Sequence, residues 1–112
     1  MTASIKDEKV PEFVFASKVL DIVDGQILAL NIDETPVALA RVDGQIVAFG
    51  DVCTHDDGPL AEGDIDGDCV VCPRHGARFN LYTGKPTFPA VQPIPIYKTK
   101  IVEDKVLVQL ME

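Results

Sequence analysis

The chain has 112 residues and a mass of 12.2 kDa, which suits a single domain and leaves little room for a second hydrophobic core. Its 18 Asp and Glu outnumber its 10 Lys and Arg, for a formal charge of -8, and this excludes nucleic acid and anionic membranes as expected partners because both require a basic face. Aromatic residues make up only 6% of the chain and Trp is absent, so Val, Ile, Leu and Ala must build the core, a composition that favours strands.

The first eleven residues are polar and charged and end at Pro11. We expect them to form a flexible tail before a domain that spans 12–112. The N-terminus lacks a basic segment followed by an apolar run, and no stretch approaches the 18 or so apolar residues of a membrane span. A cytoplasmic protein without membrane contact is therefore expected.

Short apolar runs separated by turn residues predict strands at 12–16, 26–32, 37–42, 45–49, 94–102 and 105–110. Asp43-Gly44 lies between two such runs and predicts a β-hairpin, because Gly accepts the positive φ of a tight turn. A last hairpin is expected around Glu103-Asp104. No window of eleven residues shows a helical period with caps, and eight Gly and eight Pro interrupt the chain, so the domain is expected to be nearly all β.

Two short motifs in the middle of the chain carry the candidate metal ligands. Cys53 and His55 form a C-x-H pair, Cys72 and His75 form a C-x-x-H pair, and sixteen residues separate the pairs. These two His are the only ones in the chain. Two Cys and two His could close a tetrahedral zinc site. The spacing instead favours two facing loops that give two sulfurs to one metal and two nitrogens to another, as in a mixed-ligand [2Fe-2S] centre.

The two motifs, with Gly76 after the second, resemble those of the Rieske iron-sulfur proteins. This resemblance implies one [2Fe-2S] cluster, with Cys53 and Cys72 as ligands of one iron and His55 and His75 as ligands of the other. The electron is then expected to reside on the histidine-bound iron.

The same resemblance implies an all-β Rieske fold: an antiparallel β-sandwich or barrel-like base with a small inserted cluster-binding subdomain of two loops, at about 51–93. Four prolines lie between residues 86 and 95. In Rieske proteins a proline-rich loop closes the cluster, which implies that role for residues 86–93. A rigid connector is the alternative interpretation of this segment.

Four positions distinguish the chain from high-potential Rieske proteins, which carry an extra Cys in each loop, joined by a disulfide, and a Ser and a Tyr that donate hydrogen bonds to cluster sulfur. The corresponding residues here are Gly58, Arg74, Ala77 and Phe79. Without these donors the potential is expected toward the low end of the Rieske range of roughly -150 to +300 mV. The chain is thus similar to the soluble Rieske ferredoxins.

This similarity implies an electron-transfer protein and not an enzyme, with no catalytic residue. The expected partners are a flavin-dependent ferredoxin reductase and the terminal oxygenase of a bacterial aromatic-ring dioxygenase system, and a monomer is expected. Two alternatives stay open: a small Rieske-like subunit of a larger reductase, of the nitrite reductase type, and a zinc-stabilised interaction domain. Three Cys, two of them assigned as ligands, leave no pair for a disulfide, which suits a reducing compartment.

Three other features of the sequence have more than one interpretation. Cys69 makes C-V-V-C with Cys72 but should point to the opposite face of a strand, so we interpret it as a small buried core residue. The acidic run at 64–68 has its Gly in the wrong place for a calcium loop and predicts a hairpin turn. Arg74 and Arg78, with the carboxylates Asp56, Asp57 and Glu62, could form a docking rim of mixed charge or be ordinary solvated residues.

Overall fold

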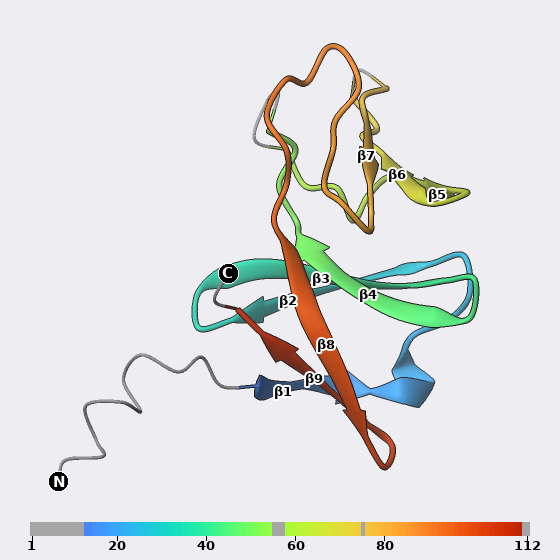
Figure 1. The fold of residues 1–112 in the computed structure, drawn as a ribbon, viewed down its shortest axis with the longest axis vertical. Helices are drawn as coiled ribbons and strands as arrows, with labels where there is room; N and C mark the ends of the chain where they lie inside the picture. Colours follow the sequence, from blue (N-terminus) through green and yellow to red (C-terminus); the bar gives the residue numbers. More distant parts are fainter. Residues whose placement is uncertain (1–12, 55–57, 75, 111–112) are drawn as a thin grey trace, which may run out of the picture.

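The computed structural model of the chain describes residues 13–54, 58–74 and 76–110. These residues form strands, loops and one short 3-10 helix, arranged as a large sheet with a smaller unit at one end (Figure 1). The prediction of an all-β, barrel-like base is confirmed. The tail expected at 1–11 lies outside the described residues.

Nine strands and one 3-10 helix, η1, are found in the described part of the chain: β1 (Phe13–Lys18), η1 (Val19–Asp21), β2 (Ile27–Ile32), β3 (Thr35–Val42), β4 (Gln45–Gly50), β5 (Asp64–Asp66), β6 (Cys69–Val71), β7 (Arg78–Asn80), β8 (Ile96–Val102) and β9 (Lys105–Gln109). Six strands form an antiparallel sheet in the order β1-β9-β8-β4-β3-β2, and three form a small sheet in the order β5-β6-β7. The first and last strands of the chain are therefore neighbours in the large sheet.

The hairpin predicted at Asp43-Gly44 joins β3 to β4. Asp43 has φ 51° and Gly44 has φ 79°, and positive φ at both positions gives the backbone twist that a two-residue hairpin requires. The expected strand at 94–102 begins only at Ile96, because Pro93 and Pro95 have no N–H to donate to a ladder.

Strands β3 and β4 are buried on both faces and separate two apolar cores. On one face Val37, Leu39 and Ala48 pack with Val106 and Val108 inside the base. On the other face a second core joins the base to the smaller unit; its buried members from β3 and β4 are Ala38, Ala40, Val42, Val47 and Phe49. A strand covered on both sides reads as a nearly continuous apolar run, as these two do.

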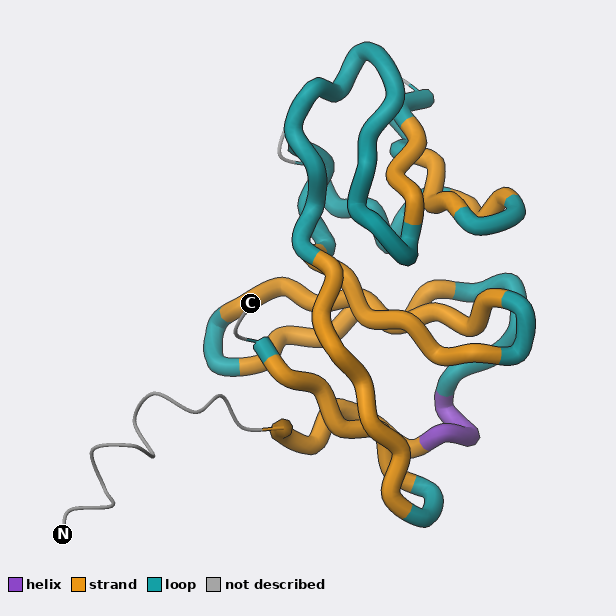
Figure 2. The backbone as a smooth tube through the Cα atoms, in the orientation of Figure 1, coloured by secondary structure: helices purple, strands orange, loops and turns teal. Residues whose placement is uncertain are grey.

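The smaller unit leaves the base after β4 and returns to it before β8, and consists of the small sheet and its loops (Figure 2). Two backbone hydrogen bonds lie where the smaller unit joins the base. Gly50 N–H donates to the Pro95 carbonyl at 2.9 Å, and Asp51 N–H donates to the Pro36 carbonyl at 3.1 Å. Within it, Gly63 packs so closely on Val71 that a Cβ at Gly63 would lie 1.9 Å from the Val71 carbonyl oxygen. The small sheet therefore requires glycine at position 63.

Candidate metal centre

The first predicted ligand loop begins where β4 ends. Its Cys53 side chain is 0% exposed, and the Cys53 N–H donates to the carbonyl oxygen of Gly58 at 2.7 Å. Leu60, also fully buried, follows the loop in the same core. The conformation of this loop therefore places the Cys53 thiol in the core.

The second predicted ligand loop connects β6 to β7 and repeats this pattern. Cys72 is 1% exposed, and its N–H donates to the carbonyl oxygen of Ala77 at 2.7 Å, again five residues further along. Gly76 N–H donates back to the Cys72 carbonyl at 3.0 Å, with Gly76 at φ 78°, a conformation that favours glycine. The two loops therefore present their cysteines from matching turns.

Both thiols belong to one group of buried residues, which also contains Leu60, Ala77 and Phe79. Neither Cys53 nor Cys72 is in a disulfide, so the sulfur of each can serve as a thiolate ligand. Two buried thiols from matching loops fit the sulfur side of a [2Fe-2S] cluster. The predicted ligands His55 and His75 lie outside the described residues, and the four-ligand assignment stays a prediction.

Asp51 is a polar residue of this region that sequence reasoning missed. The residue is 8% exposed, and its Oδ1 accepts the N–H of Ala61 at 2.7 Å, across the whole first ligand loop. Burial raises the pKa of Asp51 above its ordinary value of 3.8, against the lowering effect of hydrogen bonds from the N–H groups of Ala61 and Leu60, with a further rise from Glu62. The only sequence signal is an Asp two residues before the first Cys.

The proline-rich segment contacts the first ligand loop and strand β7, which follows the second ligand loop. The Thr54 hydroxyl, from the first loop, donates to the Gln92 carbonyl at 2.6 Å. At the other end, Arg78 N–H donates to Thr87 Oγ1 at 2.9 Å and Thr87 N–H donates to the Arg78 carbonyl at 2.8 Å. Hydrogen bonds therefore hold the segment next to Cys53 at one end and to the first residue of β7 at the other.

The four positions that distinguish the chain from high-potential Rieske proteins lie at the two loops and at β7. Gly58, Ala77 and Phe79 are buried, and Arg74 is exposed. Ala77 and Phe79 are both 0% exposed beside Cys72 in the same core. Neither carries a hydroxyl, so neither side chain can donate a hydrogen bond to a sulfur atom there.

Two of the other features have structural roles. Arg78 Nη2 forms an ion pair of 2.5 Å with Asp66 Oδ2, so this arginine joins β7 to β5. The acidic run at 64–68 is the β5–β6 hairpin, as predicted, and in the described part of the chain no three Cys, His, Asp or Glu gather as they would around an ion.

The interpretation of Cys69 as a buried core residue was wrong. It is half-buried and lies outside both cores, while its neighbour Val70 is fully buried. Cys69 opens β6 opposite Asp66 and Asn80, and the alternation of the strand turns Val70 inward and Cys69 outward.

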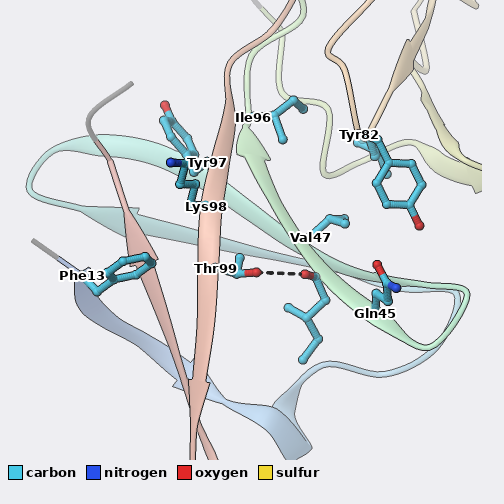
Figure 3. A pocket seen from close by; sticks show the side chains of 10 residues that line it. Phe13, Gln45, Val47, Tyr82, Ile96, Tyr97, Lys98 and Thr99 are labelled. Atoms are coloured by element: carbon cyan, nitrogen blue, oxygen red, sulfur yellow. Dashed lines mark hydrogen bonds between the residues drawn. The ribbon is translucent and has the colours of Figure 1, made fainter. Parts of the chain in front are cut away.

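A groove of about 360 Å³ lies between the base and the smaller unit. Val47, Ile96, Lys98 and Thr99 line it from β4 and β8, and Tyr82 lies at its other side (Figure 3). The pKa of Tyr82 is raised by desolvation and by the carboxylates of Asp43 and Asp68. Neither Cys53 nor Cys72 is among the described residues that line this groove.

Residues 12–98 match the family model of the Rieske [2Fe-2S] domain, and the chain belongs to this family. It is 38% identical over 90 residues to "Ferredoxin CarAc" of Metapseudomonas resinovorans, covering 79% of this chain and 84% of that protein. It is 32% identical over 100 residues to the ferredoxin component of the naphthalene 1,2-dioxygenase system of Pseudomonas putida, covering 88% and 96%. A solved complex of reduced oxygenase and oxidized ferredoxin in carbazole 1,9a-dioxygenase contains a chain with a TM-score of 0.80 and 34% identity, covering 87% of this chain and 92% of that one.

The cofactor is accordingly a [2Fe-2S] cluster, as expected. The relatives are ferredoxins, that is, electron-transfer components, and with them this chain is an electron-transfer protein and not a catalytic component. Among the described residues, no helix is long and apolar enough to cross a membrane.

Proposed function

We propose that this protein is a one-electron carrier that accepts electrons from a flavin-dependent ferredoxin reductase and delivers them to the terminal oxygenase of an aromatic-ring dioxygenase system. The observation that carries the proposal is the pair of matching loops, each with a buried cysteine whose N–H donates to the carbonyl five residues further along. Relatives named as ferredoxin components of such systems support it.

In this proposal Cys53 and Cys72 hold one iron and His55 and His75 hold the other. When bound, the cluster supplies one reversible one-electron step. The fold shields the sulfur ligands from water, because both cysteines are 1% exposed or less. Backbone hydrogen bonds order the two loops that carry them. The potential is proposed to be low, since Ala77 and Phe79 offer no hydroxyl to a cluster sulfur.

The charge of the cluster-binding region favours a partner with a basic surface. Residues 51–93 contain seven Asp and Glu but only three Lys and Arg. Glu62, Asp64 and Asp68 are exposed along the β5 edge of the small sheet, and no Lys or Arg ion pair involves them among the described residues. Opposite charges steer association most strongly at low ionic strength.

We also propose that the protein works in the cytoplasm. None of its cysteines Cys53, Cys69 and Cys72 is in a disulfide. Thiols persist in reducing compartments, and a cluster bound by thiolates is compatible with them.

The test is direct electron transfer. Protein reduced with dithionite is mixed in a stopped-flow instrument with the oxidised terminal oxygenase of carbazole 1,9a-dioxygenase, and visible absorbance follows both centres. The proposal predicts reoxidation of the ferredoxin, with a rate that falls as salt is added, and no turnover of an aromatic substrate by the protein alone. Reduced protein that stays reduced in the presence of the oxygenase, or turnover without any partner, contradicts the proposal.

A further inference from the structure

Two large apolar side chains project into solvent from the proline-rich segment. Phe88 is 87% exposed and Val91 is 77% exposed, while Ala90 between them is 3% exposed and belongs to the core. The side chains of Phe88 and Val91 thus face solvent, while Ala90 of the same short segment packs into the core. Exposed apolar side chains that gather in one place, unlike isolated ones, often mark interaction sites.

The backbone that carries them is fixed. Residues 87–90 form a turn closed by a hydrogen bond of 3.0 Å from Ala90 N–H to the Thr87 carbonyl. Thr87 is bound to Arg78 on one side, and Gln92 accepts from Thr54 on the other. Because the segment is already ordered, little conformational entropy remains to be lost when a partner covers Phe88 and Val91.

The segment also lies where an electron-transfer partner must approach. Between β7 and β8 it forms the end of the molecule opposite the β8–β9 turn (Figure 1). Its hydrogen bonds join it to the loop of Cys53 at Thr54 and to β7, which follows the loop of Cys72, at Arg78. Electron transfer between proteins weakens steeply with distance, so a partner that exchanges electrons with a cluster in these loops covers this end of the molecule.

We propose that Phe88 and Val91 form an apolar anchor that inserts into an apolar depression on the terminal oxygenase, with basic residues of the oxygenase facing the acidic β5 edge. This inference rests on the proposed function and deepens it by assigning the contact residues. The partner's chemistry follows from the two apolar side chains and from the surplus of carboxylates in 51–93.

The test compares Phe88→Ser, Val91→Ser and the conservative Phe88→Leu with a matched control, Leu20→Ser. Leu20 is 84% exposed but belongs to η1 on the base, so its replacement changes an equally exposed side chain far from the ligand loops in sequence and in the fold. Each variant is reduced and mixed with the terminal oxygenase of carbazole 1,9a-dioxygenase. The same variants are also oxidised by ferricyanide, a small acceptor that needs no protein docking surface.

We expect Phe88→Ser to lower the second-order rate with the oxygenase roughly tenfold or more, as loss of an aromatic anchor does, and Val91→Ser to lower it less. Phe88→Leu should restore most of the rate, and Leu20→Ser should match the unsubstituted protein. The rate with ferricyanide, the visible spectrum and the midpoint potential should stay unchanged in all four variants.

Phe88→Ser that reacts with the oxygenase as fast as Leu20→Ser overturns the anchor while the proposed function stands. An equal loss of rate with ferricyanide also overturns it, because the residue would then act on the cluster and not on docking. Sedimentation provides a further outcome. If the unsubstituted protein is a dimer, Phe88→Ser is a monomer and the rate of electron transfer to the oxygenase is unchanged, then Phe88 and Val91 contact a second copy of the chain and the anchor proposal is wrong. Unsubstituted protein that fails to reduce the oxygenase overturns the proposed function and the anchor with it.

Discussion

The hydroxyl of Thr54 donates a 2.6 Å hydrogen bond to the carbonyl oxygen of Gln92, across 38 positions of sequence. Thr54 lies between the two predicted ligands of the first loop, and Gln92 lies in the proline-rich segment. This bond ties the first ligand loop to the segment that is expected to close the cluster.

Thr54→Val should loosen this closure, because valine keeps the shape of threonine but cannot donate. A hydrogen bond of this kind contributes about 1 kcal/mol, so cluster loss should be about fivefold faster. Thr54→Ser keeps the donor and is the control. The measurement is the decay of visible absorbance in the presence of an iron chelator, and equal rates for the Val and Ser variants would show that the bond has no part in retaining the cluster.

Asp51→Asn should gain stability relative to the unsubstituted protein as the pH rises. Burial raises the folded-state pKa of Asp51 above 3.8, so the folded protein binds this proton more tightly than the unfolded chain does. Ionisation therefore costs stability as the pH rises from about 3.8 through the raised pKa. Asn keeps an acceptor for Ala61 N–H but does not ionise.

The readout is thermal unfolding followed by circular dichroism from about pH 3.5 to about pH 7. The unfolding temperature of Asp51→Asn minus that of the unsubstituted protein should increase across this range. Asp51→Ala, which leaves the Ala61 N–H without this acceptor, should be less stable than Asp51→Asn throughout. If the difference in unfolding temperature between Asp51→Asn and the unsubstituted protein does not change with pH, the pKa of Asp51 is not raised.

Gly63→Ala should be strongly destabilising, because the new Cβ would lie 1.9 Å from the backbone oxygen of Val71 and force β5 and β6 apart. We expect a loss at or above the top of the range of about 1–3 kcal/mol seen on overpacking. Gly67→Ala, in the same hairpin, is the control: its Cβ meets nothing within 4 Å and only its positive φ is strained, at about 1–2 kcal/mol. Denaturant unfolding measures both, and equal losses would mean that the small sheet tolerates a side chain at position 63.

Ala77→Ser and Phe79→Tyr should each raise the midpoint potential. Both positions are 0% exposed beside Cys72, and a hydroxyl there could donate to a cluster sulfur, a bond that strengthens when the cluster gains an electron. A charge-assisted hydrogen bond contributes roughly 1.5–3 kcal/mol in total, and only the difference between redox states counts. Since about 1.4 kcal/mol corresponds to about 59 mV for one electron, we expect several tens of millivolts.

Voltammetry on both single variants and on the double variant measures this shift, with the cluster shown to be intact by absorbance. Two separate donors should give roughly additive increases. Potentials that stay the same or fall would show that hydrogen bonding at these positions does not set the potential.

Local turn chemistry and strand patterning were sufficient to predict the Asp43-Gly44 hairpin, the last hairpin and the all-β class. The pairing of β1 with β9 could not be predicted from the sequence, because the strands have similar apolar compositions and composition does not specify which strands are neighbours. Cys69 was misplaced because a strand of three residues gives no alternation pattern long enough to show which side faces the core.

The cysteines of the candidate site could be found from spacing, since metal ligands impose fixed intervals on the chain. Asp51, Phe88 and Val91 could not. The burial of Asp51 depends on the return of Ala61 across the loop, and the exposure of Phe88 depends on hydrogen bonds between segments far apart in sequence. Such contacts follow from the folded backbone and leave no local pattern.

The ligand assignment is tested most directly by pulsed paramagnetic resonance on the reduced protein, which detects nitrogen nuclei bound to the cluster. Ligation by Cys53, His55, Cys72 and His75 predicts hyperfine couplings to two histidine nitrogens in a [2Fe-2S] cluster of low average g value. A reduced cluster without nitrogen couplings, or a colourless protein that contains one zinc ion, would contradict it.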